Sequence, residues 1–126
     1  MKLKNKVAIV TGGAMGNGLG IVKVFLKYGA KVAIFDYSEK VTEVAESFKA
    51  EGYDVIGYLC DVRDSEAIKT NVSDVIEKFG TVDILVNNAG VSESTPFENY
   101  TEEVEFRIIR ERITEITVMS HVYDLD

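Results

Sequence analysis

Short apolar runs alternate with amphipathic segments along the chain as far as Val86. Val7–Val10 is a continuous apolar run, as expected for a strand buried on both faces. Three further strands are expected at Lys31–Asp36, Asp54–Asp61 and Val82–Val86. The three segments between them carry apolar residues at helical spacing. Because one helix separates each pair of strands, we expect an α/β fold with a parallel sheet and right-handed crossovers.

Residues that favour helix ends lie where these predicted helices begin and stop. Ser38 is expected to cap the second helix, and Asp64 or Ser65 to begin the third. A glycine follows each helix, as suits the position just beyond a helix end: Gly29, Gly52 and Gly80.

The stretch Thr11–Gly18 is a glycine-rich turn between the first strand and the first helix. Gly12, Gly16 and Gly18 allow positive φ angles and close approach of a ligand to the backbone. The helix that follows offers unpaired N–H groups and a positive dipole end, which suit a pyrophosphate. The spacing Gly-x-x-x-Gly-x-Gly differs from the general Gly-x-Gly-x-x-Gly pattern, and a tight turn without a ligand is the alternative.

Polar residues follow the other three predicted strands. Asp36 ends the second, Asp61 ends the third, and Asn87-Asn88-Ala89-Gly90 follows the fourth. Ligands of parallel sheets bind beyond the carboxyl ends of the strands, so these residues are expected to gather at one edge. Asp36 lies about 20 residues beyond the glycine turn, where an acid binds the ribose 2′-hydroxyl of NAD and repels the 2′-phosphate of NADP. A turn-forming role for Asp36, and a capping role for Asp61, remain alternatives.

Composition narrows the class of protein. The 126 residues fit one domain, and the net charge of −7 argues against nucleic-acid and anionic-membrane partners. Cys60 is the only cysteine and is expected to be buried, which fits a reducing cytoplasm. His121 is the only histidine, so a histidine metal cluster is excluded. The basic N-terminus precedes only four apolar residues, which is too short for a signal peptide or a membrane span.

Taken together, the motifs resemble the short-chain dehydrogenase/reductase family from about Lys4 to Thr101. The similarity rests on the glycine turn, Asp36, Asp61-Val62 and Asn87-Asn88-Ala89-Gly90 at these spacings. The family implies a three-layer Rossmann fold with strand order 3-2-1-4 and a fifth strand beside the fourth. It also implies hydride transfer between a nicotinamide cofactor and an alcohol or carbonyl.

The resemblance assigns the phosphate and ribose contacts to individual residues. Gly12, Gly16 and Gly18 would bear the pyrophosphate, and Asp36 would hold the adenosine ribose, which favours NAD as the cofactor. Asn17 replaces the aliphatic residue usual in the family's turn, so contacts near the nicotinamide phosphate are expected to differ.

The same resemblance places further residues around the rest of the cofactor. Asp61 and Val62 would flank the adenine. Asn87, Ala89 and Gly90 would line the cofactor, and Asn87 would also tie the fourth strand to its neighbour.

The family's catalytic residues have no match in this sequence. The reaction needs a tyrosine whose pKa is lowered by a lysine four residues later, because an unperturbed phenol titrates near pH 10. No Tyr-x-x-x-Lys occurs, so no catalytic residue is assigned and the isolated chain is expected to be inactive. We therefore interpret residues 1–126 as a single truncated NAD-binding Rossmann domain.

Residues 101–126 form an atypical tail. Apolar spacing predicts a helix over 101–116, clearest from Val104 to Ile113, and a fifth strand over Glu115–Tyr123. An alignment with the family puts His121 at the place of its catalytic serine, with Ser120 one residue earlier, but a surface position is the simpler interpretation.

Three functions remain in competition. The chain is the cofactor-binding half of an NAD-dependent oxidoreductase, a non-catalytic NAD-binding module, or a remnant that acts through association. Self-association would use the exposed sheet edge or the 101–116 helix. A phosphoacceptor receiver domain shares the strand-end acids but needs neither the glycine turn nor the Asn-Asn-Ala-Gly segment.

Overall fold

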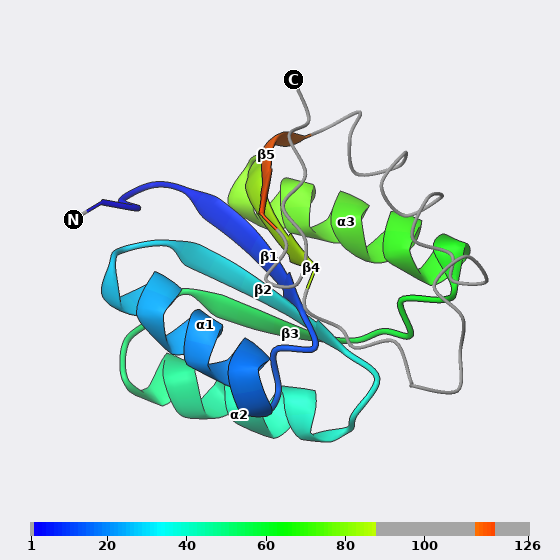
Figure 1. Ribbon diagram of the computed structural model, residues 1–126, viewed down its shortest axis with the longest axis horizontal. Coiled ribbons are helices and arrows are strands. Elements are labelled where there is room, and N and C mark those ends of the chain that lie inside the picture. Colours follow the sequence, from blue (N-terminus) through cyan, green and yellow to red (C-terminus); the bar gives the residue numbers. More distant parts are fainter. Residues whose placement is uncertain (1, 88–112, 118–126) are drawn as a thin grey trace.

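Strands and helices alternate in the computed structural model, which describes residues 2–87 and 113–117 (Figure 1). The strands are β1 (Val7–Thr11), β2 (Lys31–Asp36), β3 (Val55–Leu59), β4 (Val82–Asn87) and β5 (Ile113–Thr117). The helices are α1 (Gly16–Lys27), α2 (Lys40–Ala50) and α3 (Ser65–Phe79). Each of the four strands and three helices expected as far as Val86 is confirmed. Strand ends differ from the expected ones by at most two residues, whereas α1 begins at Gly16, inside the predicted glycine turn.

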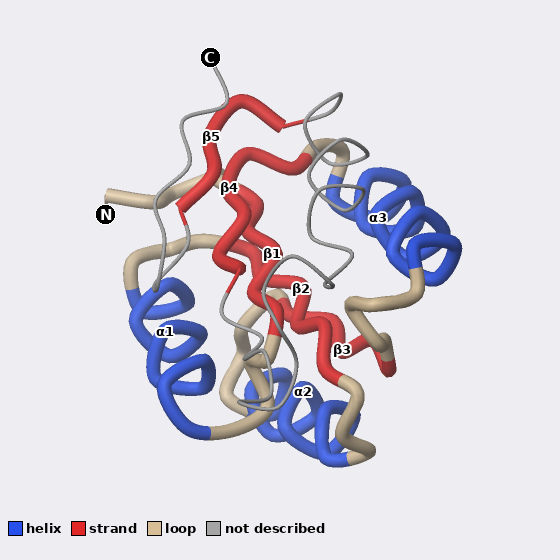
Figure 2. Tube along the Cα trace, turned by 45° about the vertical axis from the view of Figure 1, so that its right-hand side comes forward, coloured by secondary structure: helices blue, strands red, loops and turns tan. Residues whose placement is uncertain are grey.

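The strands form one parallel sheet in the order β3-β2-β1-β4-β5. Helices α1 and α2 cover one face, and α3 covers the other, which gives three layers (Figures 1 and 2). The predicted α/β class and the strand order 3-2-1-4 are confirmed, as is the position of a fifth strand beside β4.

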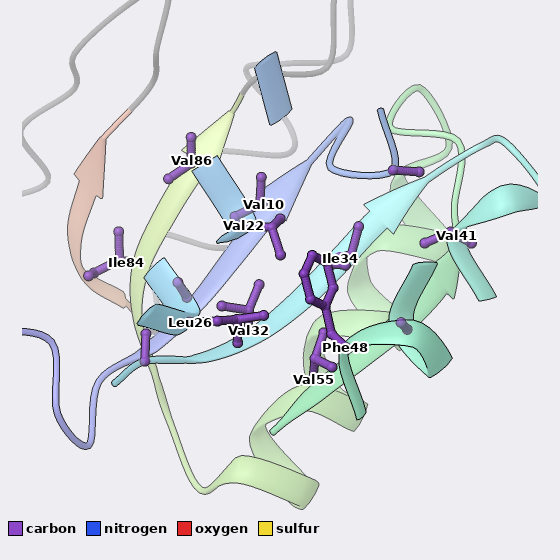
Figure 3. Close-up of a cluster of buried hydrophobic side chains, with 14 residues drawn as sticks. Val10, Val22, Leu26, Val32, Ile34, Val41, Phe48, Val55, Ile84 and Val86 are labelled. Atoms are coloured by element: carbon purple, nitrogen blue, oxygen red, sulfur yellow. The ribbon is translucent and has the colours of Figure 1, made fainter. Parts of the chain in front are cut away.

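Two apolar clusters hold these layers together, one on each face of the sheet. Ala8 and Val10 of β1 belong to the cluster under α1 and α2, whereas Ile9 belongs to the cluster under α3. Val22 of α1 and Val41 of α2 complete the first cluster with buried side chains (Figure 3). Because successive side chains point to opposite faces, a strand between two layers is apolar on both sides, as β1 is from Val7 to Val10.

The predicted helix boundaries have a clear local cause. The Asp64 carboxylate accepts hydrogen bonds from the backbone N–H groups of Glu66 and Ala67, both at 3.1 Å, and so caps α3. Gly80 ends the same helix with a φ of 90°. At the start of α2 the N-cap is Glu39, which makes no side-chain capping hydrogen bond, so the predicted cap Ser38 lies one residue too early, although its hydroxyl accepts from the N–H of Lys40 at 3.2 Å. None of the helices in the described ranges is both long enough and apolar enough to cross a membrane.

The expected boundary between the last helix and the fifth strand was wrong. Ile113–Thr117 is a strand, paired in parallel with β4 through Val82 and Ile113, so the predicted helix cannot extend to residue 116. The predicted strand began at Glu115, two residues too late. Ile113 and Ile116 have helical spacing, but isoleucine and threonine also favour strands, and pairing with β4 decides between the two. Residues 101–112 and 118–126, including Ser120 and His121, lie outside the described ranges.

Candidate cofactor site at the carboxyl edge of the sheet

The carboxyl ends of the strands meet at one edge, as the sequence predicts. Thr11 at the end of β1 pairs with Phe35 on one side and Asn87 on the other. Asp36 pairs with Leu59, after which the N–H of Cys60 donates to the Asp36 carbonyl at 2.8 Å. The glycine turn and the chain beyond β2, β3 and β4 therefore leave the sheet at the same edge. Ala89 and Gly90 lie outside the described ranges.

The glycine turn uses the conformations that its sequence suggests. Gly12 and Gly16 have φ angles of 66° and 59°, which are unfavourable for residues with a Cβ. The N–H of Gly12 donates to the carbonyl of Phe35 at 2.7 Å, which ties the start of the turn to β2. Gly18 is buried in the first turn of α1, and Asn17 is exposed beside it.

Gly13 has a role that the sequence analysis missed. A Cβ at Gly13 would lie 2.8 Å from Cγ2 of Ile34, 3.1 Å from Cγ2 of Val22 and 3.3 Å from Cγ1 of Val10. These side chains come from β2, α1 and β1, and all three are fully buried. Gly13 therefore lets the turn pack directly against the core. The consecutive pair Gly12-Gly13 was the available signal, but the neighbours of the second glycine depend on the fold.

The N-terminus of α1 carries no side chain that would compete with an anion. Met15 occupies its N-cap in an extended conformation and makes no side-chain capping hydrogen bond. The first turn also contains no acidic residue. Helix α3, by contrast, has its first N–H groups capped by Asp64. The positive end of α1 is thus suited to a phosphate group.

Asp36 lies at the end of β2 with its carboxylate turned toward the glycine turn. Its side chain is buried, with only 5% of the residue exposed. One carboxylate oxygen accepts from the N–H of Ala14 at 3.0 Å, and the other accepts from the N–H of Ser38 at 2.9 Å. Each oxygen has a second acceptor position, so the carboxylate retains the capacity to accept from ribose hydroxyls.

Asp61 is bound by a neighbour that the sequence analysis did not consider. Its Oδ1 accepts from the backbone N–H of Arg63 at 2.9 Å and from Nε at 3.1 Å, and Oδ2 lies 2.9 Å from Nη2. These hydrogen bonds lower the pKa of the Asp61 carboxyl below its ordinary value of 3.8. Val62 is 7% exposed and belongs to the apolar cluster under α3. The carboxylate is thus fixed within its own turn, and the adenine contacts of both residues remain predictions.

Replacing Arg63 by alanine is expected to raise the pKa of Asp61 toward its ordinary value. The pair stabilises the fold at pH values above that ordinary pKa, and its contribution is lost as pH falls through the lower folded-state pKa. The difference in stability between wild type and Arg63→Ala should therefore shrink on acidification. A carboxyl NMR titration measures the pKa directly. Lys78→Ala, which removes a cation paired with Asp74, should not change it, and an unchanged Asp61 pKa in Arg63→Ala would contradict the assignment.

The sequence profile of the short chain dehydrogenases matches residues 6–122. The chain belongs to the short chain dehydrogenase family. Among curated relatives, the chain is 41% identical over 119 residues to a 3alpha-hydroxysteroid dehydrogenase from Mediterraneibacter gnavus, with 92% of this chain and 48% of the relative covered. An uncharacterized oxidoreductase from Thermotoga maritima is also 41% identical, over 89% of this chain and 44% of its own length.

Solved structures of short chain dehydrogenases have the same fold. One from Burkholderia cenocepacia, determined in complex with NADP, is 30% identical and superimposes with a TM-score of 0.76 over 92% of this chain and 55% of its own. Another from Mycobacterium smegmatis is 32% identical, with a TM-score of 0.76 over 86% and 52%. The chain thus spans about half the length of the relatives that it matches.

Proposed function

We propose that this short chain dehydrogenase chain forms the NAD-binding half of an oxidoreductase that transfers hydride between a nicotinamide cofactor and an alcohol or carbonyl. The observation that carries the proposal is the arrangement at the carboxyl edge. Gly16 has a positive φ angle, and apart from its chain neighbours and the backbone of its own helix no atom of the described residues lies within 4 Å of the place where its Cβ would stand. Gly16 is the first residue of α1, whose N-cap makes no side-chain hydrogen bond, and it follows by two residues Ala14, which donates to the Asp36 carboxylate. These features fit the pyrophosphate and adenosine ribose of a dinucleotide.

Different residues would bind different parts of the cofactor. Gly12, Gly16 and Gly18 would approach the pyrophosphate, with Asn17 beside them. Asp36 would accept from the ribose hydroxyls. When bound, the nicotinamide ring supplies or accepts the hydride, and this chain's own residues bind and orient the rest of the molecule.

Further contacts would complete the proposed site. Asp61 and Val62 would border the adenine. Asn87, Ala89 and Gly90 would extend the site from the end of β4. We propose that residues 1–126 act as one cofactor-binding domain in the cytoplasm, without nucleic-acid or membrane partners.

NAD is the proposed cofactor because Asp36 is a buried carboxylate at the place where the two cofactors differ. A 2′-phosphate there would meet like charge in a poorly solvated position. The Burkholderia relative forms a complex with NADP, so the choice of cofactor must be measured for this chain.

Calorimetric titration of the purified chain with NADH and with NADPH tests this proposal. We expect micromolar binding of NADH and affinity for NADPH that is lower by at least about tenfold. Asp36→Ser should reduce this preference, because it removes the charge. Asp54→Ser removes an exposed charge just before β3, at the opposite edge of the sheet, and should leave the preference unchanged. Equal or tighter binding of NADPH by the wild type would contradict the choice of NAD.

A non-catalytic NAD-binding module is the second candidate, favoured by the absence of Tyr-x-x-x-Lys from the 126 residues. Saturable NADH binding without oxidation of any alcohol would fit this module and also the expected inactivity of the isolated half. The two candidate functions differ when a partner or segment that supplies the tyrosine and lysine is added. Only the oxidoreductase half would then oxidise an alcohol.

Self-association is a third candidate, and one observation favours it. β3 is an outer strand of the described sheet, and Leu59 at its end is 61% exposed. An outer strand with an apolar exposed residue can pair with another chain. Sedimentation that shows a monomer at high concentration would exclude association through this edge.

A further inference from the structure

The carboxylate of Asp36 joins two segments that are far apart in the sequence. Its Oδ2 accepts from the N–H of Ala14 in the glycine turn, 22 residues away, at 3.0 Å. Its Oδ1 accepts from the N–H of Ser38 at 2.9 Å, just beyond β2. Both Asp36 and Ala14 are buried, with 5% and 3% exposure. The bond to Ala14 is therefore shielded from water and fixes the turn against β2.

Among the described residues, the acceptor of the Ala14 N–H is the Asp36 carboxylate. The N–H of Gly12 donates to the Phe35 carbonyl and holds the start of the turn, two residues before Ala14. Between Gly12 and Gly16, both at positive φ, the backbone reverses to enter α1. A buried N–H that loses its acceptor is costly, so the turn would have to open or rotate to reach water if the carboxylate were removed.

We propose that Asp36 is a positioning residue that holds the glycine turn in its binding shape before any cofactor arrives. This inference rests on the proposed function and deepens it, because Asp36 then acts on the pyrophosphate end of the cofactor through Ala14 as well as on the ribose. Loss of Asp36 weakens binding by two separable routes. Substitutions that exchange Asp36 for a small residue to admit NADP therefore also loosen the turn.

A cofactor analogue separates the two routes. The 2′,3′-dideoxyadenosine analogue of NADH keeps the pyrophosphate and lacks the two hydroxyls that Asp36 would bind. If Asp36 acts only on the ribose, Asp36→Ala has no effect on the affinity for this analogue. We expect a loss of about tenfold instead, since a buried charged hydrogen bond to the turn is removed.

Asp64→Ala is the matched control. Asp64 is likewise a carboxylate bonded to two backbone N–H groups, but it caps α3 and does not bind the glycine turn. It should lower the overall stability and leave the affinity for the analogue unchanged. An equal loss of affinity in both variants would assign the effect to general destabilisation and would overturn the proposal.

Amide hydrogen exchange of the cofactor-free chain tests the turn independently of binding. In Asp36→Ala the Ala14 amide should exchange at least about tenfold faster, relative to the Ile9 amide of β1, than in wild type or Asp64→Ala. Asp36→Asn keeps one carbonyl acceptor for two N–H donors, so its Ala14 exchange rate should lie between those of wild type and Asp36→Ala. This variant serves for the test if Asp36→Ala does not fold. Unchanged Ala14 exchange in the folded Asp36 variants overturns the proposal. If the Ala14 amide exchanges faster in the Asp36 variants but the wild-type chain binds no NADH, the positioning role of Asp36 would stand and the proposed function would be refuted.

Discussion

Gly13→Ala is expected to lower the free energy of unfolding by about 1–3 kcal/mol, as overpacking of a well-packed core does. The added Cβ would stand 2.8 Å from Cγ2 of Ile34, closer than carbon atoms normally approach. Ile34, Val22 and Val10 are all β-branched, so their side chains have few alternative rotamers. All three are fully buried, which leaves them no free space to move into. The strain must therefore pass into β1, β2 or α1. Chemical denaturation monitored by circular dichroism measures the loss.

Gly20→Ala provides the matched control for this substitution. Gly20 lies on the exposed side of α1, and among residues 2–87 and 113–117 nothing beyond its chain neighbours and its own helix backbone lies within 4 Å of the place of its Cβ. Alanine favours a helix over glycine by about 0.5–1 kcal/mol, so Gly20→Ala should stabilise the chain slightly. If Gly13→Ala were as stable as wild type, the close approach of the turn to β2 would be refuted.

Gly16→Ala is expected to reduce NADH affinity by at least about tenfold, for a different reason. Its φ of 59° costs a residue with a Cβ about 1–2 kcal/mol, yet none of the described side chains occupies the space that the Cβ would enter. That space is where the pyrophosphate would approach the backbone. The substitution should therefore harm cofactor binding more than packing, which is the opposite of the result at Gly13. Calorimetry with NADH and denaturation of the same variant measure the two effects.

Gly16→Asn separates backbone strain from blocked access. Asparagine tolerates a positive φ angle better than alanine, so stability should recover, while its larger side chain still fills the space. Binding should stay weak in Gly16→Asn and remain intact in Gly20→Ala. Recovery of NADH affinity together with stability would place the pyrophosphate elsewhere.

The sequence predicts those features of the fold that depend on neighbouring residues. β1 is apolar at every position but its last because it is buried on both faces, and α3 is bounded by a capping carboxylate and a glycine. These signals are local, so the four strands and three helices before Asn87 could be anticipated. The gathering of Asp36 and the glycine turn at one edge followed from parallel strand order alone.

Features that depend on partners distant in the sequence could not be predicted in this way. The strand at Ile113–Thr117 is settled by pairing with β4, because its isoleucines also fit helical spacing. Position 13 must be a glycine because a Cβ there would meet the side chain of Ile34. Ile34 lies beside Gly13 only because of the register between β1 and β2. The N–H of Val7 finds its acceptor in the Asp83 carboxylate at 2.9 Å, across 76 residues. Such contacts become visible only when the strands are assembled.

Residue-resolved NMR of the ¹⁵N-labelled chain during titration with NADH tests the central claim most directly. We expect saturable shift changes centred on the amides of Gly12, Gly16 and Gly18, with further changes at Ser38 and Arg63, which are bonded to the two strand-end carboxylates. Amides near Asp74 on α3 should stay in place. Largest changes away from the carboxyl edge of the sheet, or none at millimolar NADH, would contradict a dinucleotide site on this turn.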